Sequence, residues 1–342
     1  MTAEKTPDLA AALAAARRPL ERRDMPSAEL RVRVKTSSWL RRLLPTRLVV
    51  RRAVAKGQAT WKDNVKEHRR ALEAMTAIVG GTARAGEVAE LARLHLIEEE
   101  ANKALFWQPW TRARMDAGSS AHLQTALSAG RGVLLSSCHL GPIFRSRSSI
   151  SSAGRILYVV SAPWFFHEPS PDYWGRRIVR WSRGMERWNE RLVYSVGAFP
   201  VVQAMLEQGE IVLLYFDMPG SRHTRFLGKS VMLSSSSARL AVNSDALILP
   251  IRPRREGHRV WTDVNEALDP RDFAGADELH DAVAQVHERW ILEAPWTLED
   301  PRRPGAWEQG ATADAWIRSE PSGAQSGVPV HDGDRPAPPV AV

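Results

Sequence analysis

Short apolar runs and helical patterns alternate through the second half of the chain, and this alternation restricts the possible folds more than any other feature of the sequence. The runs after Gly132 are five to seven residues long, which is the length of strands. We expect strands at Val133–Ser137, Arg155–Ser161, Ile211–Phe216, Leu247–Ile251 and Arg259–Val264, and helices at Pro171–Asn189, Val201–Gln208, Ser235–Asn243 and Glu278–Glu293. Strands and helices in turn predict an α/β fold with a central, mostly parallel sheet flanked by helices.

The part of the chain before this alternation is helical. Apolar residues recur at spacings of three and four from Ser37 to about Trp107, and Gly80-Gly81 separates two of the expected helices. We therefore expect a helical N-terminal region that docks on the α/β core.

Positive charge is concentrated in that region. The chain has a formal net charge of +8, and between Arg31 and Lys56 nine Lys or Arg residues occur with no Asp or Glu, interleaved with Leu, Val and Trp. A basic amphipathic segment of this kind can bind anionic lipid headgroups, at about 1 kcal/mol per basic residue near the surface. The alternative is a solvated helix face packed on the domain. No helix-turn-helix, zinc finger or aromatic RNA-binding motif accompanies the charge, so we expect no nucleic-acid partner.

The compartment is indicated by what the sequence lacks. Cys138 is the only cysteine, so no intramolecular disulfide can form, and a reducing compartment is expected. Residues Met1 to Pro26 lack the apolar core of a secretory signal, and no run approaches the roughly 18 to 20 apolar residues that span a bilayer. These features favour a peripheral protein on the cytoplasmic face of the cell membrane.

Four segments follow from these patterns. Residues 1–36 are expected to be poorly ordered, 37–130 to form a helical membrane-associating region, and 131–299 to form the α/β core. Residues 300–342 are dominated by Pro, Gly, Ser, Ala and charge, which predicts a disordered tail.

His139 is the principal candidate for chemistry. It follows the expected strand Val133–Ser137 and precedes a Leu-Gly-Pro turn. The carboxyl ends of strands are where α/β sheets collect reactive groups, and a neutral imidazole there can act as a general base. The alternative is a structural histidine. The neighbouring Cys138 should point to the opposite face, so we interpret it as a packed core residue and not as a nucleophile.

Several short motifs, in a fixed order, carry a resemblance to a known family. They are Leu43-Leu44-Pro45-Thr46-Arg47-Leu48, Glu90-Leu91-Ala92-Arg93, Gly132-Val133-Leu134-Leu135, His139-Leu140-Gly141, Leu206-Glu207-Gln208-Gly209-Glu210, Phe216-Asp217, Phe226-Leu227-Gly228-Lys229, Leu240-Ala241 and Leu249-Pro250-Ile251. In these motifs, from about Leu40 to Leu298, the chain resembles the bacterial late acyltransferases of lipid A assembly and the related phosphatidylinositol mannoside acyltransferases. Both belong to the lysophospholipid acyltransferase-like superfamily.

The resemblance implies a reaction and its partners. The expected activity is transfer of a fatty acyl group from acyl-CoA or acyl carrier protein to a hydroxyl or amine of a lipid, glycolipid or related metabolite at the membrane surface. In the family's His-x4-Asp/Glu motif the histidine is the base and the acid orients it, and the base corresponds to His139. No Gly-rich nucleotide loop and no metal-ligand spacing occurs, so we expect no metal and no cofactor beyond the acyl donor as co-substrate.

The chain departs from the family at the acid, because Phe144 occupies that position. Loss of the carboxylate that orients a catalytic histidine costs about 10^4 in turnover in a serine-protease triad. Three explanations are open. Glu168, Asp172 or Asp217 could supply a carboxylate from another loop; a backbone carbonyl could fix the imidazole; or no acyl transfer occurs. Asp217 is the best placed of the three acids, since it ends the expected strand Ile211–Phe216, although a turn residue is the simpler interpretation.

A second departure follows the strand Arg155–Ser161. The lipid A enzymes typically present an Arg there, and this chain has Ala162-Pro163-Trp164.

A basic loop follows Asp217. The resemblance places Arg222, Arg225 and Lys229 beside the phosphate-bearing parts of the substrates, and Arg and Lys suit phosphate in charge and geometry. An ordinary solvated loop is the alternative. We interpret His167, His258, His280 and His287 as structural or exposed.

The sequence therefore predicts an acyltransferase with His139 and Asp217 as its catalytic residues. The alternative is a catalytically inactive homologue that binds lipid or an acyl-carrier partner.

Overall fold

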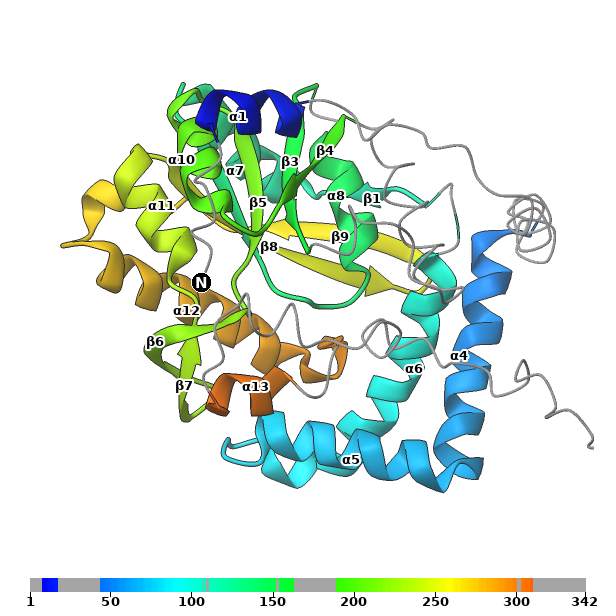
Figure 1. Cartoon of the computed structure of the whole chain (residues 1–342). Helices are drawn as coiled ribbons and strands as arrows, with labels where there is room; N and C mark the ends of the chain where they lie inside the picture. The colour runs from blue at the N-terminus through cyan, green and yellow to red at the C-terminus, as the bar shows by residue number, and fades with distance from the viewer. Residues whose placement is uncertain are drawn as a thin grey trace, which may run out of the picture.

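The expected α/β fold is confirmed by the structure, a computed structural model that describes residues 8–17, 44–106, 108, 111–151, 154–162, 189–299 and 303–309. Within these residues seven strands form one sheet in the order β1-β9-β8-β2-β5-β3-β4, and two further strands form a hairpin, β6-β7. Figure 1 shows helices on both sides of the sheet and a separate group of helices, α4 to α6, at one end of the molecule.

The sheet strands are β1 (Ala113–Arg114), β2 (Val133–Ser137), β3 (Leu157–Ser161), β4 (Glu190–Tyr194), β5 (Ile211–Tyr215), β8 (Leu247–Glu256) and β9 (Arg259–Val264). The five strands β8, β2, β5, β3 and β4 pair in parallel, and burial on both faces explains the apolar runs at Val133–Leu135 in β2 and Ile211–Leu214 in β5. Within the seven-stranded sheet, β9 pairs antiparallel with β8, and β1 pairs parallel with β9. All five parallel strands therefore present their carboxyl ends at one edge of the sheet.

Helices cover both faces of this sheet. One face packs against α7 (Ala117–Ser128) and α8 (Ile143–Ser151). The other face packs against α1 (Leu9–Arg17), α10 (Ala198–Glu207), α11 (Ser236–Ser244) and α12 (Ala276–Glu293). Short 3-10 turns lie at η1 (Ala85–Glu87), η4 (Pro270–Asp272) and η5 (Pro295–Thr297).

The helical N-terminal region consists of α4 (Thr46–Asp63), α5 (Val65–Val79) and α6 (Val88–Phe106). Asn64 separates α4 from α5 and caps α5, because its side chain accepts a hydrogen bond from the backbone N–H of Glu67. Helix α6 connects the region to the core: Leu91 and Leu96 belong to the same buried cluster as residues of α12, and Leu105 clusters with Val260 of β9. None of the described helices is both long and apolar enough to cross a bilayer.

The hairpin of β6 (Pro219–Phe226) and β7 (Lys229–Leu233) occupies the segment that the sequence predicted as a basic loop. Its two-residue turn, Leu227-Gly228, has positive φ at both residues, as a type I′ turn requires. A leucine at φ 54° is uncommon, and burial of the Leu227 side chain in the core offsets the backbone cost. Hydrophobic anchoring therefore replaces the usual Asn or Gly.

Four further segments differ from the sequence-based expectation. Residues Leu9–Arg17, within the segment 1–36 that was expected to be poorly ordered, form α1 and bury Ala16. Strand β8 continues through Pro250 and Pro253 to Glu256, because Gly257, at φ 58°, turns the chain directly into β9. Strand β4 was not expected from the sequence. It follows the predicted helix Pro171–Asn189, most of which lies outside the described residues. Residues Arg303–Gln309, within the predicted disordered tail, form α13, because Trp307 is buried in the core with 1% exposure.

Candidate active site

His139 and Asp217 come from two adjacent parallel strands. Strands β2 and β5 pair in register, so that Ser137 lies opposite Tyr215 at their carboxyl ends. His139 and Asp217 each follow two residues after these paired ends. Equal offsets from strands about 4.8 Å apart bring the two side chains together, at the edge of the sheet where reactive groups collect.

The imidazole and the carboxylate form a direct hydrogen bond. Nδ1 of His139 lies 2.8 Å from Oδ1 of Asp217, and the backbone N–H of His139 donates to Oδ2 over 3.1 Å. Asp217 is fully buried, whereas the His139 side chain keeps 16% exposure. The two hydrogen bonds use both carboxylate oxygens and offset the cost of burying the charge. The Asp217 carboxylate thus holds His139 at two points, the ring nitrogen Nδ1 and the backbone N–H.

This arrangement selects the tautomer. A carboxylate accepts only, so Nδ1 carries the proton that it donates to Asp217. In the neutral ring the lone pair then lies on Nε2, at the other side of the imidazole. His139 is therefore oriented to accept a proton at Nε2.

Tyr215 forms one wall of the pair. Its ring stacks on the His139 ring with centroids 4.1 Å apart and planes inclined by 30°. Burial raises the pKa of Tyr215 to about 12, so the phenol stays neutral throughout the physiological range. A neutral aromatic face against imidazole favours the charged imidazolium that forms when His139 accepts a proton.

Two imidazoles behind Asp217 are structural. The Phe216 ring packs between His280 and His287, with ring centroids 5.1 Å from each. Nε2 of His287 contacts the Ser136 hydroxyl and Nε2 of His280 contacts the Thr224 hydroxyl, each at 2.9 Å. Burial lowers the pKa of both histidines to about 4, so both are neutral near pH 7. They fix Phe216, the residue next to Asp217, by packing.

Phe144, at the motif position where the resemblance predicts an acid, lies in α8 in aromatic surroundings. Its ring meets that of Phe106 edge to face, with centroids 5.2 Å apart, and the Arg147 guanidinium lies 5.5 Å from its centroid. Arg147 also pairs with Glu190, whose pKa burial raises to about 7. The Asp217 carboxylate, two residues after β5, reaches His139.

The three basic residues of the hairpin have different surroundings. Arg222 pairs with Asp277 and, at 3.0 Å, with Asp281 of α12. Lys229 pairs with Glu308 of α13 at 2.6 Å, and Arg225 is exposed on the hairpin surface. The contacts of Arg222 and Lys229 anchor the hairpin, and substrate binding by the three residues remains a prediction. Glu168 and Asp172, the other acids considered from the sequence, lie outside the described residues.

Sequence reasoning missed the residues that support the pair. Tyr215 was assigned only to a strand, although its place at the strand end, two residues before Asp217, was a usable signal. Trp307 donates its indole N–H to the backbone carbonyl of Asp217 over 2.9 Å, from a segment whose composition suggested disorder. The backbone of Thr297 and Glu299 bonds to the turn after His139, and no sequence signal marks such contacts.

No protein-family model and no curated protein matches this chain. Among solved structures, the chain is similar to the crystal structure of the 1-acyl-sn-glycerophosphate (LPA) acyltransferase PlsC from Thermotoga maritima. That similarity covers 61% of this chain and 81% of the other, with 16% sequence identity and a TM-score of 0.35.

Proposed function

We propose that this protein is an acyltransferase in which His139 is the general base and Asp217 orients it. The observation that carries the proposal is the hydrogen bond of 2.8 Å between a buried carboxylate and Nδ1 of a partly exposed histidine at the carboxyl edge of a parallel sheet. A base held in one tautomer by a buried acid is an arrangement that suits general-base catalysis.

The proposed reaction begins with proton transfer to His139. Nε2 accepts the proton of an acceptor hydroxyl or amine as the acceptor attacks the thioester carbonyl of acyl-CoA or acyl carrier protein. The tetrahedral intermediate then collapses, the carbon–sulfur bond breaks, and the leaving thiolate takes the proton from the imidazolium. The products are an ester or amide and a free thiol. Asp217 contributes by stabilising the imidazolium between the two proton transfers.

The substrates and the location follow from the sequence resemblance and the charge. The acceptor is proposed to be a lipid, glycolipid or related metabolite, with Arg222, Arg225 and Lys229 available for phosphate groups. The protein is proposed to lie on the cytoplasmic face of the cell membrane. Helix α4 supports this location, since Arg47, Arg51 and Arg52 are exposed there.

A second candidate function is a non-catalytic homologue that binds lipid or an acyl-carrier partner. The observation in its favour is Phe144, whose aromatic packing at the position of the family acid leaves no carboxylate in the His-x4-Asp/Glu motif. The Asp217 carboxylate favours the enzyme, because an inactive protein has no chemical need for a buried charge aimed at an imidazole.

One experiment separates the two. The purified chain is incubated with a panel of acyl-CoA and acyl-carrier-protein donors and a bacterial lipid extract, and acylated products are detected by mass spectrometry. The enzyme predicts products that His139→Ala abolishes while the protein stays folded. Identical traces without product from wild type and variant, together with binding of acyl carrier protein or lipid, would support the non-catalytic candidate.

A further inference from the structure

We infer that Trp307 is a positioning residue for the His139–Asp217 pair, and that α13 is therefore part of the site. The kinetic consequences rest on the proposed function, whereas the effect on His139 does not. The inference comes from one buried hydrogen bond, from the packing around it, and from the way in which the neighbouring segment holds His139.

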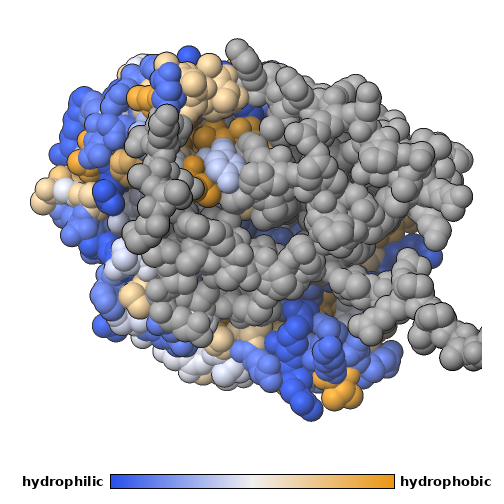
Figure 2. Space-filling model, viewed as in Figure 1, coloured by the Kyte–Doolittle hydropathy of each residue, from blue (hydrophilic) through white to orange (hydrophobic). Residues whose placement is uncertain are grey.

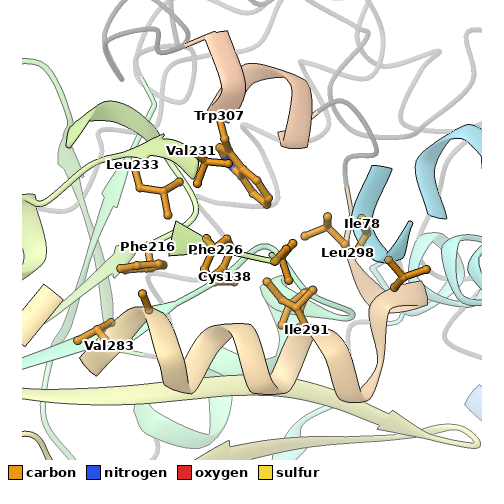
Figure 3. Packing of buried hydrophobic residues seen from close by; sticks show 14 of the residues in the cluster. Ile78, Cys138, Phe216, Phe226, Val231, Leu233, Val283, Ile291, Leu298 and Trp307 are labelled. Atoms are coloured by element: carbon orange, nitrogen blue, oxygen red, sulfur yellow. The ribbon is translucent and has the colours of Figure 1, made fainter. Parts of the chain in front are cut away.

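Trp307 makes its hydrogen bond in the interior of the protein. Its side chain is among the largest that are fully buried, and its Nε1–H donates to the backbone oxygen of Asp217 over 2.9 Å. The ring meets that of Phe226 edge to face, with centroids 5.6 Å apart. Figure 3 shows Trp307 over Phe226, with Val231 and Leu233 beside it. Loss of this donor would leave a buried carbonyl without its indole partner, which is unfavourable, so the bond favours one orientation of the Asp217 peptide.

Asp217 needs such support because it lies beyond the sheet. The backbone N–H of Phe216 donates to the carbonyl of Ser137 over 2.7 Å, one residue past the last pair in the β2–β5 register. The chain then leaves β5 for β6, and the Asp217 carbonyl accepts from a side chain, Trp307, instead of from the sheet. Rotation of this peptide would move the carboxylate relative to the imidazole, and misplacement by about 1 Å can cost about 10^2-fold in rate.

The segment before α13 holds the other member of the pair. The backbone N–H of Glu299 donates to the carbonyl of His139 over 2.9 Å, and the N–H of Gly141 donates to the carbonyl of Thr297 over 2.7 Å. Residues Thr297–Glu299 therefore fix the turn that carries His139, and Trp307, eight residues later, fixes Asp217. Both members of the pair are held by one stretch near the C-terminus, outside the strands that deliver them.

The surface contact of α13 is secondary to the indole bond. Lys229 and Glu308 form an ion pair at 2.6 Å, with both side chains more than one-third exposed. Exposed ion pairs of this kind contribute little to stability, because water and salt screen them. If α13 acts through Trp307, removing the Lys229–Glu308 ion pair should leave the hydrogen bond between His139 and Asp217 unchanged.

The test uses the full-length protein and a readout independent of any substrate. Nitrogen-15 NMR of the His139 ring reports which nitrogen carries the proton. We expect Trp307→Phe, which keeps a ring and removes the N–H donor, to lower the share of the Nδ1–H tautomer. Asp217→Asn should change the tautomer ratio in the same direction. Adding Trp307→Phe to Asp217→Asn should then cause no further change. A tautomer ratio equal to that of wild type in Trp307→Phe would overturn the inference.

A matched control separates positioning from loss of packing. Phe226→Leu removes the aromatic partner of Trp307 but keeps the hydrogen bond, so it should destabilise the fold without changing the tautomer ratio. An equal change in both variants would mean that Trp307 is merely structural. If Trp307→Phe does not fold, 3-benzothienylalanine placed at position 307 keeps the shape of the indole and replaces only its N–H.

Activity gives a second readout. In the acyl-transfer assay Trp307→Phe should lower kcat by about tenfold and change KM by less than about twofold, because it acts on the base and not on substrate binding. A wild-type protein without acyl-transfer activity would contradict the proposed function, and the NMR comparison would still decide the role of Trp307.

Discussion

His139 and Asp217 lie at the same offset on two hydrogen-bonded parallel strands, each two residues past the facing ends Ser137 and Tyr215. In the His-x4-Asp/Glu motif the acid comes from the residues that follow the histidine, whereas here it comes from the neighbouring strand. When two adjacent parallel strands pair in register, residues at equal offsets past their paired ends lie close together and can form such a pair. Under the proposed function, Asp217 supplies the carboxylate that the motif position lacks, and the register of β2 with β5 brings it there.

The first prediction concerns Asp217. Asp217→Asn keeps the shape of the side chain but removes the charge and allows the wrong imidazole tautomer. If the protein is an acyltransferase, turnover should fall by about 10^3 to 10^4. Initial rates of acyl transfer at saturating donor measure the effect.

The matched comparison is Phe144→Leu, which changes the motif position without changing a charge. It should lower turnover by less than about tenfold, since Phe144 does not hold the imidazole. A larger loss in Phe144→Leu than in Asp217→Asn would show that the carboxylate of Asp217 is not the orienting acid.

The strands and the pair were accessible to sequence reasoning for a physical reason. Strands buried on both faces are continuous apolar runs, so β2 and β5 stand out, and a polar residue after each marks the site edge. Among Glu168, Asp172 and Asp217, the sequence favoured Asp217 only by its place at a strand end, because the sequence does not give the strand order. Only the pairing of β2 with β5 brings Asp217 to His139.

The supporting contacts could not be predicted because they depend on tertiary packing. Trp307 lies in a segment of low apolar content, where one buried indole outweighs the composition. The turn at Leu227-Gly228 lacks the usual Asn-Gly signal, so the hairpin was interpreted as a loop. The strand expected at Leu247–Ile251 continues to Glu256.

The second prediction concerns the aromatic wall of the site. An aromatic face against imidazolium contributes about 1 kcal/mol, which corresponds to roughly fivefold in rate. Tyr215→Phe keeps that face and should change kcat by less than about twofold, whereas Tyr215→Leu should lower it about fivefold. Since the Tyr215 pKa is raised to about 12, wild type and Tyr215→Phe should give the same pH–rate profile up to pH 10. A distinct alkaline limb in wild type would mean that the phenol takes part in proton transfer.

The third prediction concerns stability in acid. Burial lowers the pKa of His287 from 6.5 to about 4, so between these values the unfolded state binds the proton and the folded state does not. The free energy of unfolding should therefore fall as pH decreases from 6.5 to 4, by roughly 3 kcal/mol from this residue. His287→Gln removes the titration and keeps a polar group near Ser136. Urea unfolding at several pH values should show a shallower acid loss in the variant than in wild type.

The difference in unfolding free energy between wild type and His287→Gln isolates the contribution of His287. His280 and Glu190 also have shifted pKa values, and the shift of Glu190 acts in the opposite direction, but both groups are present in wild type and variant alike. Parallel stability curves from pH 7 to pH 4 would contradict a neutral, buried His287.

The fourth prediction concerns the attachment of the N-terminal helices. A Cβ atom added to Gly57 in α4 would lie 2.6 Å from Cα of Ile97 in α6, where the contact is backbone and cannot rotate away. Gly57→Ala gains about 1 kcal/mol in helix propensity, but separating α4 from α6 should cost more, for a net loss of about 1 to 3 kcal/mol. In α7, Gly118→Ala has its nearest neighbour at 3.7 Å and should be neutral or stabilising. Equal urea midpoints for the two variants would contradict close packing of α4 on α6.

The fifth prediction tests the proposed membrane surface on α4. Arg47, Arg51 and Arg52 are exposed on this helix together with Leu48, which is 49% exposed. In Figure 2 the part of the surface below the grey atoms, where Figure 1 places the turn from α4 to α5, is mainly hydrophilic. Three basic residues near an anionic bilayer contribute about 1 kcal/mol each, so replacing all three by Gln should weaken vesicle binding by roughly 100-fold. Co-sedimentation with vesicles of mixed anionic and neutral lipid measures the affinity.

The vesicle experiment needs a control that separates the position of the arginines on α4 from their contribution to the net charge. Arg155, Arg239 and Arg259 are exposed outside α4, and replacing them by Gln removes the same charge from a chain whose net charge is +8. Because salt screens charges over about 8 Å at physiological ionic strength, only residues close to the bilayer should contribute strongly. The control variant should therefore retain most of the affinity. Equal losses in both triple variants would assign vesicle binding to overall charge and would remove α4 as the membrane-docking surface.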